Sequence, residues 1–113
     1  MNQTINKVLS ILDKYRFIYQ SEKELQNHIE KKLKENNIKY SREYRLSDKD
    51  IVDFYIDNIA FEVKIKGSTN SIYRQLKRYA EKDNVKAIVL ITAKSMGLPK
   101  EIEGKKSYYY KLR

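Results

Sequence analysis

The stretch that decides the fold reads Ile51-Val52-Asp53-Phe54-Tyr55-Ile56-Asp57-Asn58-Ile59-Ala60-Phe61-Glu62-Val63-Lys64-Ile65. Two apolar-rich runs flank Asp57-Asn58, and these two residue types tolerate the positive φ angles of a two-residue hairpin turn. Such a turn places Ile56 opposite Ile59 and, counting outward, Asp53 opposite Glu62. The stretch therefore predicts a β-hairpin.

Side chains alternate along a strand, so one face of this hairpin is predicted to be wholly apolar. Its members are Val52, Phe54, Ile56, Ile59, Phe61, Val63 and Ile65. The other face brings together Asp53, Glu62 and Lys64. Directly opposed like charges destabilise a strand pair by up to about 1 kcal/mol, so two facing carboxylates make sense where a divalent cation binds between them.

Oxygen ligands on a rigid scaffold suit Mg²⁺, and Lys64 can then contact the attacking water or a phosphate. The alternative is a solvated hairpin face in a chain rich in Lys and Glu. Glu-x-Lys alone is weak, because it also occurs at Glu30-Lys32 and Glu103-Lys105. The pair at Glu62 differs from these two because it lies in an apolar strand with an acid registered opposite.

The composition narrows the class of protein. The chain has 113 residues, which predicts a single domain over residues 1–113. Lys and Arg total 24 against 15 Asp and Glu, and the net charge of +9 favours a polyanion such as nucleic acid. The lack of cysteine and of a signal-like or long apolar segment predicts a soluble, intracellular (cytoplasmic) protein that does not enter membranes.

Apolar spacing and turn residues predict the other elements. These are a helix at about 3–16, a helix from the capping box of Ser21 and Glu24 to about residue 35, strands at 39–46 and 86–92, a helix at 70–82 and an edge strand at 107–112. The order is α-α-β-β-β-α-β-(β), an α/β arrangement with a mixed sheet flanked by helices. Residues 1–19 are then an N-terminal helical extension, 20–92 the core, and 93–113 a C-terminal loop and edge strand.

In this order the chain resembles the PD-(D/E)XK nuclease superfamily, whose restriction-endonuclease-like fold has an αβββαβ core. The resemblance covers residues 20–92 and rests on Asp53 followed by Glu62-Val63-Lys64, with Val52 at the position of the family's proline. It implies that Asp53, Glu62 and the backbone carbonyl of Val63 hold Mg²⁺, or Mn²⁺ in its place. It also implies that Lys64 positions or activates the hydrolytic water.

The family carries a further glutamate on its first helix. Glu22 is our choice, because it lies three residues before Leu25 on the inward stripe, although a first-turn acid is also favoured by the helix dipole. Gln75 and Tyr79 match the Gln-x-x-x-Tyr motif of the RecB-like branch. The resemblance implies that this pair helps to organise the active site and contacts the nucleic acid, while Tyr79 also fits a core position.

The sequence and this resemblance favour an Mg²⁺-dependent deoxyribonuclease that hydrolyses phosphodiester bonds. Basic side chains near the first strand and on the helix at 70–82 are expected to hold phosphates, although each also suits a solvated surface. These are Arg42, Arg45, Arg74, Lys77 and Arg78. The alternative is a non-catalytic basic module that binds nucleic acid or assembles with other molecules. Endonuclease or exonuclease action, DNA or RNA as the partner, and a possible homodimer all stay open.

Overall fold

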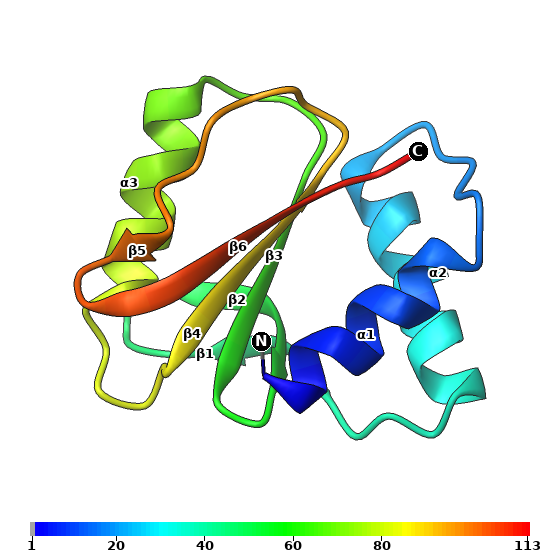
Figure 1. Ribbon diagram of the computed structural model, residues 1–113, viewed down its shortest axis with the longest axis horizontal. Coiled ribbons are helices and arrows are strands. Elements are labelled where there is room, and N and C mark those ends of the chain that lie inside the picture. Colours follow the sequence, from blue (N-terminus) through cyan, green and yellow to red (C-terminus); the bar gives the residue numbers. More distant parts are fainter. Residues whose placement is uncertain (1) are drawn as a thin grey trace.

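The structure is a computed structural model that describes residues 2–113 as three helices and six strands (Figure 1). In chain order these are α1 (Gln3–Asp13), α2 (Glu22–Glu35), β1 (Ser41–Arg45), β2 (Ile51–Ile56), β3 (Ile59–Lys64), α3 (Thr69–Ala80), β4 (Ala87–Thr92), β5 (Glu101–Ile102) and β6 (Lys105–Lys111). The predicted order of elements is confirmed through β4, and so is the α/β class with a mixed sheet.

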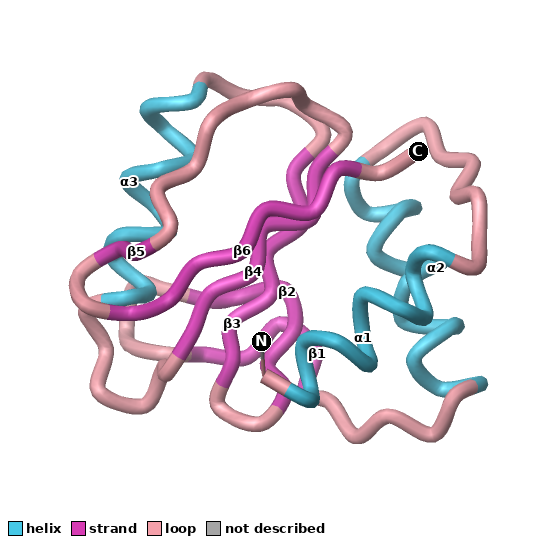
Figure 2. Tube along the Cα trace, in the orientation of Figure 1, coloured by secondary structure: helices cyan, strands magenta, loops and turns pink. Residues whose placement is uncertain are grey.

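The six strands form one sheet in the order β1-β2-β3-β4-β6-β5. β2 runs antiparallel to β1 and β3, whereas β4 runs parallel to β3 and β6. The chain passes from β3 to β4 through α3, as a connection between parallel strands requires. Figure 2 shows the strands stacked side by side between the helices.

The predicted strand at residues 107–112 is confirmed as β6, which pairs with β4 from Lys106 to Lys111. The two-residue strand β5, which the sequence does not predict, pairs with β6 only at Lys105 and Lys106, so the rest of β6 lies at the edge of the sheet as predicted. Glu103 and Gly104 both have positive φ angles, 50° and 75°, and so they close a tight turn from β5 into β6. A strand of two residues is too short to show an alternating pattern, which is why the sequence does not reveal β5.

The predicted hairpin between β2 and β3 is confirmed. Asp57 and Asn58 have φ angles of 51° and 64°, as a two-residue turn of this kind requires. Ile56 pairs with Ile59, and two residues further out Phe54 pairs with Phe61. The register is therefore the one that the apolar pattern and the turn residues predict.

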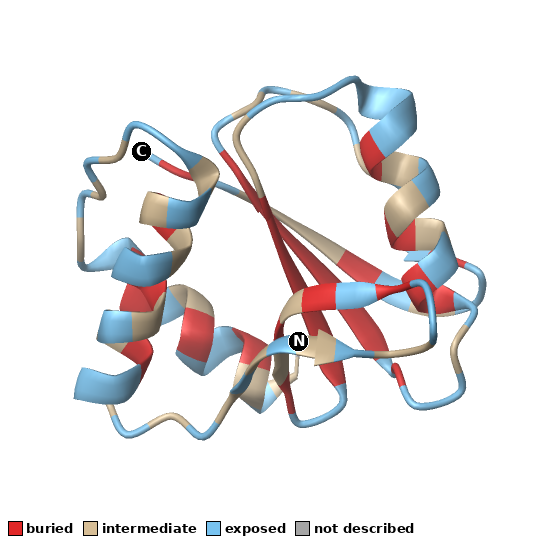
Figure 3. Cartoon of the chain, turned by 180° about the vertical axis from the view of Figure 1, so that it is seen from behind, coloured by how far each residue is buried: buried red, intermediate tan, exposed pale blue. Residues whose placement is uncertain are grey.

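Each face of the sheet has its own apolar core (Figures 1 and 3). α1 and α2 cover one face, and their buried side chains lie against those of the hairpin and β4. The predicted stripe of α2, Leu25, Ile29 and Leu33, belongs to this core. α3 covers the other face with Ile72, Leu76, Tyr79 and Ala80, which are the four residues predicted to be buried.

Val52 lies on the opposite face of the sheet from the one that the alternating pattern predicts. Val52 packs in the α3 core, whereas Phe54 packs in the core formed by α1 and α2. The alternation along β2 therefore breaks at Asp53. On the neighbouring strand Arg42 and Tyr44 pair with residues of β2, but Glu43 between them has a φ of 51° and leaves the regular ladder. Both strands are irregular at the same level, next to the acid that was predicted to be functional.

Candidate active site at the diverging ends of β2 and β3

The candidate site lies where β2 and β3 diverge. Their backbone pairing ends at Phe54 and Phe61, and beyond it side-chain carboxylates act as acceptors. Asp53 Oδ2 accepts a hydrogen bond from the Val63 N–H at 2.7 Å, and Glu62 Oε1 accepts one from the Asp53 N–H at 3.3 Å. Reciprocal bonds thus join the two strands, and each carboxylate keeps a second oxygen.

A third carboxylate comes from the first turn of α2. The Ser21 hydroxyl caps this helix by accepting a hydrogen bond from the Glu24 N–H at 3.1 Å, which makes Glu22 the first helical residue. Glu22 Oε1 then accepts a hydrogen bond from the Ile65 N–H at 2.8 Å, one residue after β3 ends. Glu22 therefore lies on the inward side of its helix, beside the end of β3.

Lys64 brings an ammonium group to these carboxylates. Its Nζ lies 3.5 Å from Glu62 Oε2, and its side chain is 23% exposed while that of Glu62 is 3% exposed. The lysine therefore reaches from the buried acid toward solvent. With all side chains ionised, three carboxylates face one ammonium group, and the cluster carries excess negative charge.

Gln75 and Tyr79 connect α3 to the buried acid. The Gln75 side-chain amide donates to the Tyr79 hydroxyl at 2.8 Å. That hydroxyl lies 2.9 Å from the Ile51 carbonyl and 3.2 Å from Glu62 Oε1, and its single proton can serve either acceptor. Tyr79 is thus both a fully buried core residue and a hydrogen-bond partner of the carboxylate.

Asp53 and Glu62 are hard to ionise. Burial, together with the neighbouring Asp53 carboxylate, raises the pKa of Glu62 to about 8, although Lys64 acts in the opposite direction. Burial also raises the pKa of Asp53, against the hydrogen bond from Val63. Burial and the two carboxylates raise the pKa of Tyr79, so that its hydroxyl stays protonated. The protein therefore compensates the negative charge of the cluster only in part.

The chemistry of these groups fits a hard divalent cation. Asp53 Oδ1 and Glu62 Oε2 accept neither of these backbone hydrogen bonds, so both oxygens are available as ligands of a cation. In an extended strand the carbonyl of Val63 points to the same side as its N–H, which is the side of Asp53. Within residues 2–113 no three His, Cys, Asp or Glu side chains are grouped so that they could hold a metal ion. Water or phosphate oxygens would therefore have to complete the coordination.

Two arginines predicted to bind nucleic acid are paired with acids. Arg42 Nη1 lies 2.9 Å from Glu30 Oε1 and also donates to an amide side chain of α2, so that it joins β1 to this helix. Arg78 Nε donates to Asp50 Oδ1 at 2.9 Å and joins α3 to the loop before β2. A phosphate-binding role for either arginine stays a prediction and requires these pairs to open.

The other three basic residues differ in their contacts. Arg45 Nη1 donates to the Asp48 carbonyl at 2.9 Å. Lys77 Nζ lies 3.5 Å from Glu103 Oε1 at the turn between β5 and β6. Arg74 is exposed on α3. Of the predicted basic residues, Lys64 is the one that contacts the carboxylate cluster.

Asp50 is a buried acid that the sequence does not reveal. It is 4% exposed, and its second oxygen lies 3.4 Å from Lys82 Nζ while the first accepts from Arg78. It directly precedes Ile51, whose carbonyl belongs to the hydrogen-bond network of the site. Residues 47–50 read as a polar loop, and nothing in that pattern singles out one of its acids.

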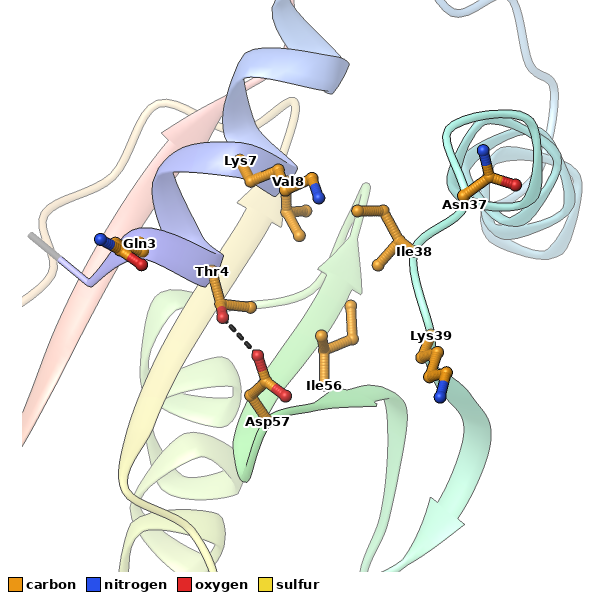
Figure 4. A pocket seen from close by; sticks show the side chains of 9 residues that line it. All are labelled: Gln3, Thr4, Lys7, Val8, Asn37, Ile38, Lys39, Ile56 and Asp57. Carbon is orange, nitrogen blue, oxygen red and sulfur yellow. Dashed lines mark hydrogen bonds between the residues drawn. The ribbon is translucent and has the colours of Figure 1, made fainter.

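A separate pocket of about 290 Å³ lies between the start of α1 and the hairpin turn (Figure 4). Its lining includes Lys7, Lys39 and Asp57, and Asp57 accepts a hydrogen bond from the Thr4 hydroxyl. Asp57 lies four residues from Asp53 along β2, a distance of roughly 13 Å at strand geometry. The pocket is therefore at the opposite end of the hairpin from the carboxylates.

The remaining observations concern the chain as a whole. Among residues 2–113, none of the helices combines the length and the apolar character needed to cross a bilayer. Compared with known protein families, with curated proteins and with solved structures, the chain matches none of them.

Proposed function

We propose that this protein is a metal-dependent nuclease that hydrolyses phosphodiester bonds in DNA. The observation that carries the proposal is the buried Glu62 carboxylate, 2% exposed, in hydrogen-bonded contact with Asp53 and in reach of Lys64. An acid so placed is costly to ionise in the protein alone. A divalent cation would remove that cost, and a substrate phosphate would fit the same oxygen-rich position.

The order of these residues along the chain also supports the proposal. Asp53, then Glu62-Val63-Lys64, then Gln75 and Tyr79 is the order by which the sequence resembles the RecB-like branch of the PD-(D/E)XK nucleases. Membership of that superfamily is part of the proposal. The net charge of +9 agrees with a polyanionic substrate.

Each residue has a distinct task in this proposal. Asp53, Glu62 and the Val63 carbonyl would hold Mg²⁺, or Mn²⁺ in its place, and Glu22 would orient water beside them. When bound, such an ion lowers the pKa of a coordinated water and stabilises the charge of the phosphate. The Lys64 ammonium would assist the attacking water and stabilise the negative charge that develops on the phosphate during attack.

Gln75 and Tyr79 would act through Glu62. Their hydrogen bonds fix the rotamer of the buried carboxylate, so that Glu62 Oε2 faces Lys64 and the open side of the site. Groups that orient a ligand in this way typically change metal affinity or activity by about 10- to 100-fold when they are removed.

A second candidate function is a basic module that binds nucleic acid without catalysis. The observation in its favour is that the carboxylates also satisfy backbone groups: Asp53 and Glu22 accept from the N–H groups of Val63 and Ile65, which β2 no longer pairs. This function requires no metal. It predicts salt-sensitive binding that tightens when Asp53 or Glu62 is neutralised, because repulsion of phosphate is reduced.

The deciding experiment is incubation with labelled single-stranded, duplex, flap and junction DNA and with RNA, with and without Mg²⁺ or Mn²⁺. Glu62→Gln, Asp53→Asn and Lys64→Ala are each expected to lower cleavage by at least about 100-fold. The matched control is Glu103→Gln, because Glu103 and Lys105 repeat the Glu-x-Lys spacing away from the cluster. The product lengths distinguish endonuclease from exonuclease action. Cleavage that survives all three substitutions would refute the proposal.

A further inference from the structure

Beyond the carboxylate cluster, the segments that follow the parallel strands β3, β4 and β6 carry basic side chains. The segments that leave their carboxyl ends, residues 65–68, 93–96 and 112–113, contain Lys66, Lys94 and Arg113 and no acid. The segments that enter the opposite ends, residues 57–58, 81–86 and 103–104, contain four acids and two lysines. These are Asp57, Glu81, Asp83, Glu103, Lys82 and Lys86. The carboxyl ends of parallel strands are also where ligands bind in open α/β sheets.

The register of the sheet places a second lysine, Lys111, in line with Lys64 at the carboxyl ends of the strands. Lys64 on β3 pairs with Thr92 on β4, and Thr92 pairs with Lys111 on β6. In-register neighbours on parallel strands point to the same face, so these three side chains form one row on the face that α3 covers. Two strand spacings separate Lys64 from Lys111, which is roughly 10 Å.

The loop after β4 lies between the two lysines and is tied to β6. The Thr92 hydroxyl accepts a hydrogen bond from the Lys94 N–H at 3.0 Å, and the Tyr109 hydroxyl donates to the Lys94 carbonyl. Lys111 Nζ donates to the Ser95 hydroxyl at 2.6 Å. Ala93 and Ser95 are small and exposed, so they leave room for a nucleic acid backbone to approach this loop, which the hydrogen bonds already hold in place.

Lys111 also differs from the basic residues that the sequence singled out. Arg42, Lys77 and Arg78 are each paired with an acid. Within residues 2–113 Lys94 and Lys111 have no acidic side chain within ion-pair distance. Their charge is available to an external anion.

We propose that one strand of the nucleic acid substrate runs from Lys64 across the carboxyl ends of β4 and β6, and that Lys111 holds one of its phosphates. This inference rests on the proposed nuclease function. It assigns the path of the strand on one side of the cleaved bond, along Lys94 and Lys111. The contact is to the backbone, so it adds affinity without reading sequence.

The test compares Lys111→Ala with Lys106→Ala. Lys106 is an exposed lysine on the same strand, it also has no ion pair within residues 2–113, and it lies at the opposite end of the strand, paired with Ala87. Both substitutions remove one positive charge, so a general effect of net charge is the same in each. Binding of a labelled DNA strand is measured by fluorescence anisotropy in EDTA at several salt concentrations, and cleavage is measured separately with Mg²⁺.

Lys111→Ala is expected to weaken binding roughly three- to tenfold, to reduce the slope of log affinity against log salt by about one, and to raise KM with little change in kcat. Lys106→Ala is expected to leave all three quantities near wild type, and Lys111→Arg to restore binding. Lys94→Ala gives a second variant on the same path, with the same direction expected. Circular dichroism checks that each variant is folded.

Two results would overturn the inference in different ways. If the wild type cleaves DNA while the Lys111 and Lys106 variants behave alike, the path is wrong and the nuclease function stands. If the wild type neither binds nor cleaves any nucleic acid in the panel, the proposed function fails, and the path fails with it.

Discussion

Glu62, which is 2% exposed, carries the carboxylate on which the candidate site depends. Glu62 lies on β3, between β2 and β4. Its carboxylate accepts a hydrogen bond from the Asp53 N–H and lies within hydrogen-bond distance of the Tyr79 hydroxyl. Its pKa is raised from an ordinary value of 4.5 to about 8, first by burial and second by Asp53. In the metal-free protein this acid therefore holds its proton through a range of pH in which an unfolded chain has lost it.

This difference makes stability depend on pH. The folded state binds one more proton than the unfolded state between about pH 4.5 and about pH 8, so the contribution of Glu62 to stability is full below that window and is lost as the pH rises through it. In the absence of metal, we expect the free energy of unfolding to fall by up to about 1.4 kcal/mol per pH unit there. Urea unfolding at pH 5.5 and pH 8 measures the effect.

Glu62→Gln should flatten this dependence, since the amide does not titrate. The variant should therefore be more stable than the wild type at pH 8 in EDTA. Glu101→Gln is the control, because Glu101 is an exposed glutamate on β5, away from the cluster, and this variant should lose stability with pH as the wild type does. An equal slope in the wild type and in Glu62→Gln would show that Glu62 is not the titrating group.

Tyr79→Phe tests the hydrogen bonds that hold the buried acid. The substitution keeps the ring in the core but removes the partner of the Gln75 amide and of the Ile51 carbonyl. We expect a loss of about 1–3 kcal/mol in unfolding free energy and cleavage that is about 10- to 100-fold slower. The control is Tyr73→Phe on the same helix, whose hydroxyl has no hydrogen bond within residues 2–113. Equal effects of the two substitutions would contradict a positioning role for Tyr79.

At the scale of the elements, the sequence predicts what is determined locally. The hairpin follows from alternating residues around Asp57-Asn58, and α3 follows from a stripe of apolar residues at helical spacing. β5 is too short to leave a pattern, so its pairing with the first two residues of β6 is not predicted. The face of Val52 depends on an irregularity shared with Glu43 on another strand, which the pattern of β2 alone does not contain.

The junction between α3 and the loop before β2 is the next testable feature. Burial alone would raise the pKa of Asp50, and the hydrogen bonds from Arg78 and Lys82 outweigh that effect and lower it. This stabilising contribution is therefore present above the ordinary pKa of 3.8 and is lost as the pH falls through the lowered value. The ion pairs fix α3 against the strand that carries Asp53.

Asp50→Asn should lower the unfolding free energy by about 2 kcal/mol at pH 7, because two cations lose their partner. The difference from wild type should shrink as the pH falls below the ordinary pKa of 3.8 and the folded protein begins to protonate Asp50. Asp48→Asn is the matched control, an exposed acid of the same loop that should change stability by less than about 0.5 kcal/mol. Urea unfolding at pH 7 and at several values from pH 4 down to pH 2 follows this change. A loss that stays as large as at pH 7 over this whole acidic range would show that charge is not the cause.

At the scale of the whole molecule, the candidate site is assembled from four elements. Asp53 and Glu62 come from one hairpin and are predicted together from its turn, although the paired register ends at Phe54 and Phe61 and the two acids meet through hydrogen bonds of their carboxylates. Glu22 and Tyr79 arrive from helices on opposite faces of the sheet, and apolar stripes predict which side of each helix points inward. What the sequence cannot supply is how surface charges pair between elements. Arg42 and Arg78, for example, are bound to acids 12 and 28 residues away in the chain.

Because the fold gathers more carboxylates than cations at one point, a metal ion should stabilise the entire molecule. A ligand that binds only the folded state adds about 2.7 kcal/mol when its concentration is 100 times Kd. Mg²⁺ should therefore raise Tm in a concentration-dependent way, and more at pH 8 than at pH 6, because protons compete for Glu62. The charge of +9 also responds to general screening, so the comparison uses NaCl at matched ionic strength. Asp53→Asn should lose most of the Mg²⁺ effect, and an equal rise in Tm for this variant would place the cation elsewhere.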